Sequence, residues 1–382
     1  MSNYNIPLSQ PDINESDIQA VVDVMRSNQL SLGPKLVEFE NKFKELSSAK
    51  YAVAMNSGTS VLHTCIRALE IADGDEVITS PYSFIASSNC ILFERAKPVF
   101  VDIDPETLCI DPKLIQKAVT SKTKAILPIH VFGLPCDMDA IMQIAREKNL
   151  AVIEDSCEAI GAEYKGKPAG TLGDCGVFAF YPNKQMTTGE GGVLVTNNEK
   201  IAKLCASMRN QGRDEGMGWL SHTRLGYNYR LSDINCALGI EQIKRLPQFL
   251  AQRAQVAAWY DEIIAEECPQ LIKLCKPEAD CTRSWFVYVV QIPYEYSEEQ
   301  RNDLIYYLRS KGIGCNQYFP PIHLQPFYYE LGYRRGDFPI TELVGSHSFS
   351  IPFFNKLSKE KAVTVIREIK NWLNDTPPQK GK

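Results

Sequence analysis

AVIED at residues 151–155 and GVFAFYPNKQMTTGEGGVLVT at residues 176–196 are the stretches that decide the fold. Each contains short apolar runs that predict buried strands, next to polar and glycine-rich residues that predict loops. Earlier in the chain, similar apolar runs occur as YAVAM (51–55), EVIT (76–79), PVFVD (98–102) and AILPI (125–129). Helical patterns such as 60–70 and 137–148 separate most of these runs. Strands that are apolar on both faces and alternate with helices predict an α/β fold, with a mostly parallel central sheet covered by helices.

The apolar runs at 176–180 and 192–196 follow each other too closely for a helical crossover between them. We therefore expect part of the sheet to be antiparallel, because parallel neighbours need a longer connection. In open α/β sheets, ligands bind beyond the carboxyl ends of the strands. Residues that carry chemistry are therefore expected where these apolar runs end.

The regions on either side of the sheet predict helices and a second, smaller unit. A capping-box pattern at Ser16 and Gln19 predicts the start of a first helix, and Pro34 predicts the start of a second. After Arg230, the patterns predict helices at 232–245, 248–266, 297–311 and 358–374, and a strand at 284–291 (SWFVYVVQ). The expected division is a large domain over residues 1–246, which includes the N-terminal helices, and a small C-terminal α+β domain over 247–382.

Composition limits the functional classes. The chain has 382 residues, of which 44% are hydrophobic and 23% charged, and its net charge is −5 with the two signs interleaved. A nucleic-acid-binding surface would need a clustered basic face, so no nucleic-acid partner is expected. No apolar run reaches the roughly 18 residues that a membrane span requires, so a cytoplasmic protein without a membrane partner is expected. The twelve cysteines form no Cys-x-x-Cys pair and share no ligand spacing with the five histidines, so no metal site is expected.

Two ionisable residues stand at predicted strand ends. Asp155 ends AVIED, where it is either a turn-forming or capping residue or a carboxylate that holds a proton on a heterocyclic nitrogen. Lys184 follows GVFAF and precedes Gly189, Gly191 and Gly192. A lysine there is either an ordinary surface residue after a turn or a desolvated amine suited to a Schiff base.

Two further segments supply groups suited to a flat, phosphorylated ligand. Ser57, Gly58 and Thr59 follow YAVAM at a predicted helix start, where backbone N–H groups bind anions, although Ser and Thr are also common helix caps. Phe84 follows the next strand and can cover a flat ring or simply pack in the core. A phosphate site, an aromatic cover, a carboxylate and a lysine are together what pyridoxal 5′-phosphate (PLP) requires.

The chain resembles the DegT/DnrJ/StrS nucleotide-sugar aminotransferases, which share PLP fold type I with aspartate aminotransferase. The resemblance is carried by IPLSQPDI, LSLGPKLVEFE, SGTS, PVFVDIDPETL, IEDSCEAIGA, FYPNKQMTTGEGG, LGYNYRLSDINCALG and YFPPIH. These segments extend over nearly the whole length of the chain. The lysine segment and the GYNYR segment are the most specific of them.

The resemblance implies roles for individual residues. Lys184 matches the lysine that forms the Schiff base, and Asp155 matches the partner of the pyridine nitrogen. Phe84 matches the stacking aromatic residue, and the phosphate cradle is matched by Ser57, Gly58 and Thr59. Asn228 in GYNYR matches a residue that reaches the phosphate in the neighbouring subunit, which implies a homodimer with shared active sites. In YFPPIH, Tyr318 and His323 match positions near the sugar, although an ordinary loop histidine remains an alternative for His323.

Two positions depart from the family pattern. The serine that often precedes the lysine by five residues is Ala179 here, so one hydroxyl contact to the phosphate is missing or is replaced by another group. The Gln or His that usually meets the phenolic oxygen of the cofactor is Glu158 here. A carboxylate beside a phenolate is repulsive unless one of the two carries a proton, so we expect a shared proton.

The resemblance implies that an amino group passes from an amino acid, with glutamate as the expected donor, to a ketone at C3 or C4 of a nucleotide-linked sugar. The product would be an amino sugar nucleotide for a polysaccharide, a glycan or an antibiotic. One alternative is another fold type I activity, such as an amino-acid lyase or the sugar dehydratase branch. That branch replaces the lysine by histidine, whereas Lys184 is retained here. A second alternative is a non-catalytic regulator, against which the intact Lys184 and Asp155 argue.

Overall fold

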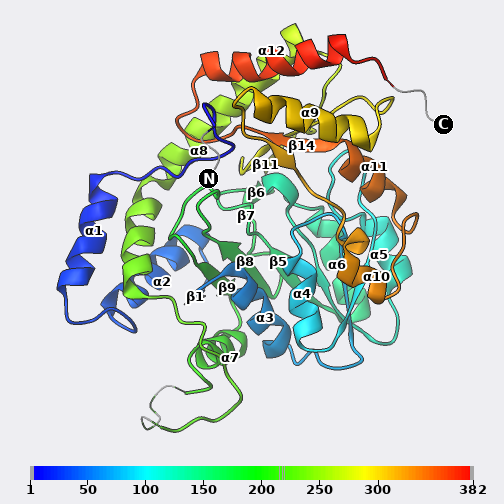
Figure 1. Cartoon of the computed structure of the whole chain (residues 1–382). Coiled ribbons are helices and arrows are strands. Elements are labelled where there is room, and N and C mark those ends of the chain that lie inside the picture. The colour runs from blue at the N-terminus through cyan, green and yellow to red at the C-terminus, as the bar shows by residue number, and fades with distance from the viewer. Residues whose placement is uncertain (1–3, 215, 217, 219, 379–382) are drawn as a thin grey trace.

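A seven-stranded sheet forms the centre of the computed structural model, which describes residues 4–214, 216, 218 and 220–378 (Figure 1). Its strands, in spatial order, are β1 (Tyr51–Met55), β9 (Gly192–Thr196), β8 (Cys175–Ala179), β5 (Ala151–Asp155), β4 (Thr123–Leu127), β2 (Glu76–Thr79) and β3 (Lys97–Phe100). Strand β9 is antiparallel to both of its neighbours, whereas the pairs from β8 to β3 are parallel. The predicted α/β class, including an antiparallel part of the sheet, is confirmed.

The two faces of the sheet pack against different helices. In β1, Val53 and Met55 join a core cluster with α3 (Gly58–Ala68) and α7 (Glu199–Arg209), whereas Ala52 and Ala54 join a cluster with α2 (Pro34–Ser47) and α8 (Asp233–Glu267). Side chains of a strand alternate between its two faces, so one apolar run serves both layers. The helices of this large unit are α1 (Glu15–Arg26), α2 (Pro34–Ser47), α3 (Gly58–Ala68), α4 (Ala86–Phe93), α5 (Pro112–Ala118), η1 (Val131–Gly133), α6 (Met138–Lys148), α7 (Glu199–Arg209) and the first half of α8 (Asp233–Glu267).

Helix α8 is one continuous helix of 35 residues, although the sequence predicts two helices, 232–245 and 248–266. Pro247 lies inside it, at the position where a break is expected. A proline removes one helical hydrogen bond at a cost of about 3 kcal/mol. Burial of Leu246 and Phe249 on either side offsets this cost. The domain division near residue 246 falls inside this helix and remains a prediction.

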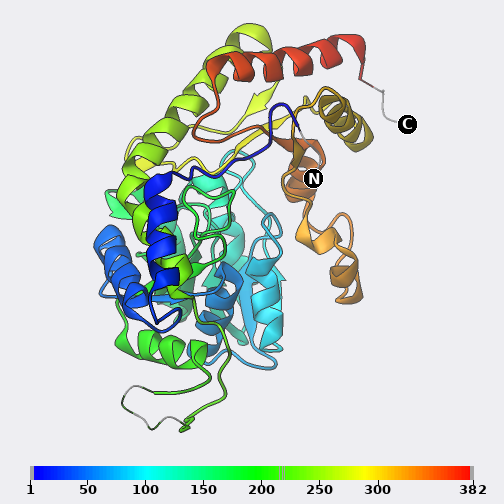
Figure 2. The same ribbon diagram turned by 60° about the vertical axis from the view of Figure 1, so that its left-hand side comes forward.

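A smaller unit lies over the second half of α8 (Figures 1 and 2). Its antiparallel sheet has the order β10 (Ile272–Lys273), β12 (Tyr288–Gln291), β14 (Ser348–Ile351) and β13 (Asn316–Gln317). Its helices are α9 (Glu298–Ser310), η2 (Ile322–Leu324), α10 (Pro326–Glu330), α11 (Pro339–His347) and α12 (Lys359–Asp375). A separate three-stranded sheet consists of β11 (Cys281–Thr282), β6 (Glu163–Tyr164) and β7 (Lys167–Pro168).

Two predicted boundaries differ from the structure. The strand predicted at 284–291 is only Tyr288–Gln291, because Ser284 donates its N–H to Gly133 of the large unit instead of to a neighbouring strand. The first helix is capped by Asn14 rather than by Ser16, with Asp17 completing the capping box. Asp17 is buried and pairs with Arg245 of α8, so a tertiary contact selects the earlier cap.

Among the described residues, no helix is long and apolar enough to cross a membrane.

Candidate active site

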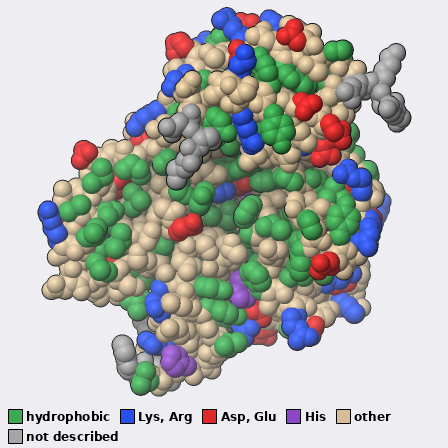
Figure 3. All heavy atoms as spheres, in the orientation of Figure 1, with side chains coloured by type: hydrophobic (Ala, Val, Ile, Leu, Met, Phe, Trp, Pro, Cys, Tyr) green, Lys and Arg blue, Asp and Glu red, His purple; other side chains and the backbone are tan. Residues whose placement is uncertain are grey.

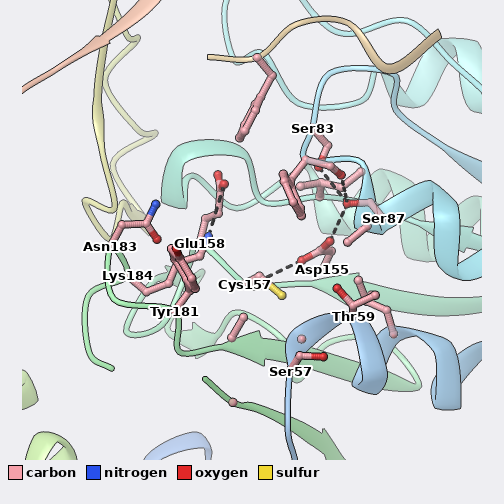
Figure 4. A pocket seen from close by; sticks show the side chains of 18 of the residues that line it. Ser57, Thr59, Ser83, Ser87, Asp155, Cys157, Glu158, Tyr181, Asn183 and Lys184 are labelled. Carbon is pink, nitrogen blue, oxygen red and sulfur yellow. Dashed lines mark hydrogen bonds and ion pairs between the residues drawn. The ribbon is translucent and has the colours of Figure 1, made fainter. Parts of the chain in front are cut away.

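A cavity of about 540 Å³ opens at the carboxyl ends of the parallel strands. This volume lies within the roughly 300–1,000 Å³ that is common for small-molecule and cofactor sites. Eight of the predicted site residues line it: Ser57, Gly58, Thr59, Phe84, Asp155, Glu158, Lys184 and Tyr318. Figure 4 shows how most of these side chains point into the same space. The expectation that polar groups converge at this edge of the sheet is therefore met by the geometry.

The N-terminus of α3 forms one wall of the cavity. Ser57 caps the helix by accepting a hydrogen bond from the N–H of Ser60 at 3.1 Å. The first N–H groups of a helix have no acceptor within it, so those of Gly58 and Thr59 are available to an anion. A Cβ on Gly58 would lie 2.7 Å from the Cβ of Ala179, so only glycine fits there. Ala179, where the resemblance predicts serine, thus packs directly against Gly58.

Asp155 ends β5 and is held as a hydrogen-bond acceptor. Its Oδ2 accepts from the Ser87 hydroxyl at 2.8 Å, and its Oδ1 accepts from the N–H of Cys157 at 3.1 Å. Ser87 in turn pairs with the Ser83 hydroxyl at 2.9 Å. Two donors orient the carboxylate toward the cavity, as Figure 4 shows. Sequence reasoning did not identify Ser87, because nothing marks its contact with a residue 68 positions away.

Lys184 lies in the turn after β8, with its side chain only 14% exposed. Its Nζ is 3.7 Å from Oε1 of Glu158 and 3.9 Å from the ring centroid of Phe286. The backbone of this turn is fixed by a hydrogen bond from the N–H of Lys184 to the carbonyl of Tyr181 at 2.9 Å. The amine therefore reaches the cavity between a carboxylate and an aromatic face. Phe286 comes from the small unit, and its role was not predicted.

Glu158 is buried beside Lys184. Its Oε2 accepts a hydrogen bond from the N–H of Phe132 at 2.9 Å. Burial raises the pKa of the Glu158 carboxyl, and the charge of Asp155 adds to this increase, whereas Lys184 and the Phe132 N–H oppose it. A carboxyl group with a raised pKa holds a proton more readily than an exposed glutamate. This direction agrees with the expectation that Glu158 shares a proton, which remains a proposal.

Glu158→Gln is expected to stabilise the cofactor-free protein at alkaline pH and to have little effect in acid. A carboxyl group whose pKa is raised on folding contributes stability that is lost as pH rises through its folded pKa. Glutamine carries no charge to bury and keeps an oxygen for the Phe132 N–H. The measurement is the free energy of unfolding of both proteins from acid to alkaline pH.

Glu267→Gln is the matched control, with the opposite sign. Arg367 and Lys370 lower the pKa of the half-buried Glu267 carboxyl by hydrogen bonding. Its carboxylate therefore contributes stability that is lost as pH falls, so this variant should be less stable than wild type at neutral pH and equal to it in acid. A Glu158→Gln difference that is constant over the whole pH range would contradict the raised pKa.

Two aromatic residues of the predicted set border the opening. Phe84 lines the cavity and is 63% exposed, so its ring is free to cover a flat ligand. Tyr318 also lines the cavity, and its hydroxyl accepts a 3.5 Å hydrogen bond from the Asn183 amide. Burial raises the pKa of Tyr318. Both placements are compatible with the predicted roles.

His323 and Asn228 do not line the cavity. His323 is 0% exposed, and its Nε2 pairs with Oε1 of Glu342 at 2.9 Å while its ring packs against Phe338. A fully enclosed side chain cannot meet a substrate in this conformation, so the structure does not support the predicted substrate contact. Asn228 is exposed, and its carbonyl accepts from the Asn56 side chain at 3.4 Å. Its side chain is not among those that line the cavity of the same subunit.

The residues present fit PLP. The helix N-terminus at Gly58 suits a phosphate, Asp155 suits a protonated pyridine nitrogen, and Lys184 supplies an amine for the aldehyde. The remaining walls are mostly apolar, and Phe84 offers an open aromatic face. The chemistry of these groups is that expected from the sequence.

Comparison with known proteins agrees with this fit. The family model for the DegT/DnrJ/EryC1/StrS aminotransferase family matches residues 11–370. GDP-perosamine synthase of Escherichia coli O157:H7 is 36% identical, with 97% of this chain and 99% of that protein covered. Spore coat polysaccharide biosynthesis protein SpsC of Bacillus subtilis is 35% identical, with 97% of each chain covered.

Solved structures show the same fold. The PLP-form of Spr1654 from Streptococcus pneumoniae superposes with a TM-score of 0.92 at 30% identity, covering 97% of this chain and 99% of that one. PseC of Helicobacter pylori, an aminotransferase involved in the biosynthesis of pseudoaminic acid, gives a TM-score of 0.91 at 27% identity, covering 97% and 100%. The chain therefore belongs to the DegT/DnrJ/EryC1/StrS aminotransferase family and is a PLP-dependent sugar aminotransferase of fold type I.

Proposed function

We propose that this enzyme transfers the amino group of L-glutamate to a keto group of a nucleotide-linked deoxy-sugar, giving an amino sugar nucleotide for polysaccharide or glycan assembly. The observation that carries the proposal is the convergence of Lys184, Asp155 and the α3 N-terminus in one cavity. The relative named for GDP-perosamine supports a nucleotide-linked product, and the relative named for spore coat polysaccharide supports its use in a polysaccharide.

Each residue of the cavity has a separate proposed role in the reaction. PLP, when bound, supplies an aldehyde carbon that takes up an amino group and a ring that accepts an electron pair. Lys184 would bind the aldehyde carbon between turnovers and would move the proton to and from the reacting carbon with its Nζ. Asp155, oriented by Ser87 and the Cys157 N–H, would hold a proton on the pyridine nitrogen. The N–H groups of Gly58 and Thr59 would bind the phosphate.

The proposed function is tested in two half-reactions. The enzyme loaded with PLP is mixed with L-glutamate, and release of 2-oxoglutarate and loss of the visible band of the lysine-bound cofactor are followed. A nucleotide-linked 3-keto or 4-keto sugar is then added, and its amination is measured by mass spectrometry. Restoration of the band by the keto-sugar supports the proposal. An enzyme that reacts with other amino acids but not with glutamate would contradict the donor, and one that eliminates water from the sugar would contradict transamination.

The notion of a homodimer with shared sites has its own support in the structure. Large hydrophobic side chains are exposed at the cavity (Phe84 and Tyr181) and on the segment that leads to Asn228 (Leu220 and Leu225). Figure 3 shows hydrophobic side chains spread over the face of the molecule that is drawn in Figure 1. Apolar side chains that cluster on one face of a protein often mark a contact with another protein. We propose that a second copy covers this face and that Asn228 binds the phosphate in the partner's site.

The segment around Asn228 is held in place from its own subunit, where Asn228 forms an isolated β-bridge with Asn210. Tyr227 and Tyr229 stack with ring centroids 4.8 Å apart, on either side of Asn228. The Tyr227 hydroxyl donates to Glu94 at 3.1 Å, and the Tyr229 hydroxyl meets Nδ1 of His63 at 3.1 Å. These contacts hold the two neighbours of Asn228 in place, and Asn228 itself is exposed.

Mixed dimers of Asn228→Ala and Lys184→Ala are expected to regain activity that neither variant has alone. In a two-fold symmetric dimer with shared sites, a mixed dimer contains one site with both residues intact, hence about half the activity of wild type. The measurement is the turnover of doubly tagged heterodimers after co-expression. Absence of recovery, with heterodimer and bound cofactor demonstrated, would place Asn228 outside the partner's site.

A further inference from the structure

Arg253 in the middle of α8 is a buried cation without a carboxylate partner. Its side chain is 2% exposed, and no ion pair to it occurs within the described ranges 4–214, 216, 218 and 220–378. Burial lowers the pKa of its guanidinium to about 10, so it remains charged at neutral pH. Burying such a charge is costly unless fixed polar groups replace water. The polar groups that replace water around the Arg253 guanidinium therefore indicate its role.

The two hydrogen-bond acceptors of Arg253 are backbone carbonyls on either side of the cavity lysine. One terminal nitrogen donates to the carbonyl of Lys184 at 3.1 Å, and the other donates to the carbonyl of Phe286 at 2.9 Å. The ring of Phe286 is the one that lies 3.9 Å from Nζ of Lys184. The guanidinium thus binds the backbone of Lys184 and the backbone of Phe286, whose side chain packs on the Lys184 amine.

These contacts join three segments that are distant in sequence. Lys184 belongs to the turn after β8, Phe286 leads into β12 of the small unit, and Arg253 lies on the helix that connects the two units. A neighbouring contact reinforces the junction, because the Gln185 amide donates to the carbonyl of Glu158 at 2.6 Å and to the Ser284 hydroxyl at 2.9 Å. The planar guanidinium is suited to bridge two carbonyls at a fixed spacing.

We propose that Arg253 is a positioning residue for Lys184: it fixes the lysine backbone and the Phe286 ring relative to each other, so that the amine enters the cavity in one orientation. A lysine side chain has four rotatable bonds, and its reactivity depends on how many of its conformers place the amine correctly. Misplacement of a reacting group by about 1 Å can lower a rate about 100-fold. The proposal rests on the proposed role of Lys184 as the cofactor lysine.

Arg301 provides a matched control for a purely structural role. It is also buried, at 1% exposure, and its Nη1 donates to the carbonyls of Gly345 at 3.0 Å and Ser348 at 2.5 Å. These acceptors belong to α11 and β14 of the small unit, and none of them lies in the lysine turn or lines the cavity. Arg301→Met is therefore expected to remove similar backbone contacts and lower stability without affecting the lysine.

The test compares Arg253→Met, Arg253→Lys, Phe286→Leu and Arg301→Met with wild type, each as the full-length enzyme reconstituted with PLP. The measurements are the thermal unfolding midpoint, the rate at which added PLP acquires the visible band of the lysine-bound form, and kcat and KM for L-glutamate in the exchange of isotopic label with 2-oxoglutarate, which serves as the amino acceptor. Borohydride reduction followed by peptide mass spectrometry identifies the lysine that carries PLP.

For Arg253→Met we expect a fall of about 10- to 100-fold in the rate of PLP capture and in kcat, with little change in KM. Arg253→Lys should recover part of both rates, because an ammonium can still donate to these carbonyls. Phe286→Leu keeps the carbonyl but removes the ring, and it should slow both rates. Arg301→Met should unfold at a lower temperature, with unchanged rates.

Three outcomes would contradict the positioning role of Arg253 or the assignment of Lys184. A folded Arg253→Met with wild-type PLP capture and kcat would overturn the positioning role and leave Arg253 as a structural anchor. If that variant does not fold, wild-type rates in Phe286→Leu would overturn it equally. PLP fixed by borohydride to another lysine in wild type would overturn the assignment of Lys184, and this proposal with it.

Discussion

Lys184→Ala should leave the fold intact and abolish turnover. The side chain borders an open cavity and contributes only a 3.7 Å approach to Glu158 and a contact with the Phe286 ring. Removing it also removes the amine that binds the cofactor and the group that moves the proton. Loss of proton transfer alone accounts for roughly a 10²- to 10⁴-fold decrease in rate. The measurements are the visible absorbance of the protein incubated with PLP and the single-turnover rate with L-glutamate.

An exposed lysine supplies the control. Lys276→Ala lies in the small unit and lines no part of the cavity, so its absorbance and turnover should equal those of wild type. Lys184→Ala is expected to keep a wild-type circular dichroism spectrum, which separates loss of chemistry from loss of folding. Turnover retained by Lys184→Ala without an added amine would end the assignment of this lysine.

The contrast between Lys184 and Arg253 shows what the sequence can predict about this site. Lys184 and Asp155 stand where apolar runs stop, and the rule that ligands bind at the carboxyl ends of parallel strands places both in one cavity. Arg253 has no such signal, because it lies in a long helix whose pattern gives no indication of the segments it meets. Its acceptor on Lys184 is 69 positions away in the chain, so only the packed structure reveals it.

The predicted helices differ from the structure where tertiary contacts override local signals. Pro247 predicts a break, but α8 continues, because its first half packs on the large unit and its second half on the small unit. The carbonyl of Ile243 loses one helical donor, and the packing on both sides outweighs that loss. Burial along the whole of α8 therefore determines its helical structure more strongly than the local propensity of Pro247.

His323 shows the limit of transferring roles by resemblance. A histidine in YFPPIH is equally compatible with a substrate contact and with an internal hydrogen bond. The structure pairs it with Glu342 and packs its ring against Phe338. Tyr318, five positions earlier, does line the cavity. In the segment YFPPIH, Tyr318 therefore borders the cavity and His323 does not.

Asp155→Asn is expected to bind PLP on Lys184 and yet to transaminate about 10²- to 10³-fold more slowly, the usual cost of losing one fixed electrostatic group at a site of developing charge. Asparagine is nearly isosteric, and its oxygen can still accept from the Cys157 N–H. Its amide nitrogen would then face Ser87, whose hydroxyl can turn to accept, because Ser83 offers a second partner at 2.9 Å. The neutral amide cannot hold a proton on the pyridine nitrogen, so the ring loses its capacity to take up an electron pair.

Ser87→Ala is the matched control, since it keeps the carboxylate and removes one of its two orienting donors, and it should slow the reaction much less. The measurement is the single-turnover rate with L-glutamate for both variants. Equal rates for Asp155→Asn and wild type would reduce Asp155 to a structural residue at the end of β5, whereas a slow Asp155→Asn with normal PLP capture assigns its carboxylate to the electron-accepting step.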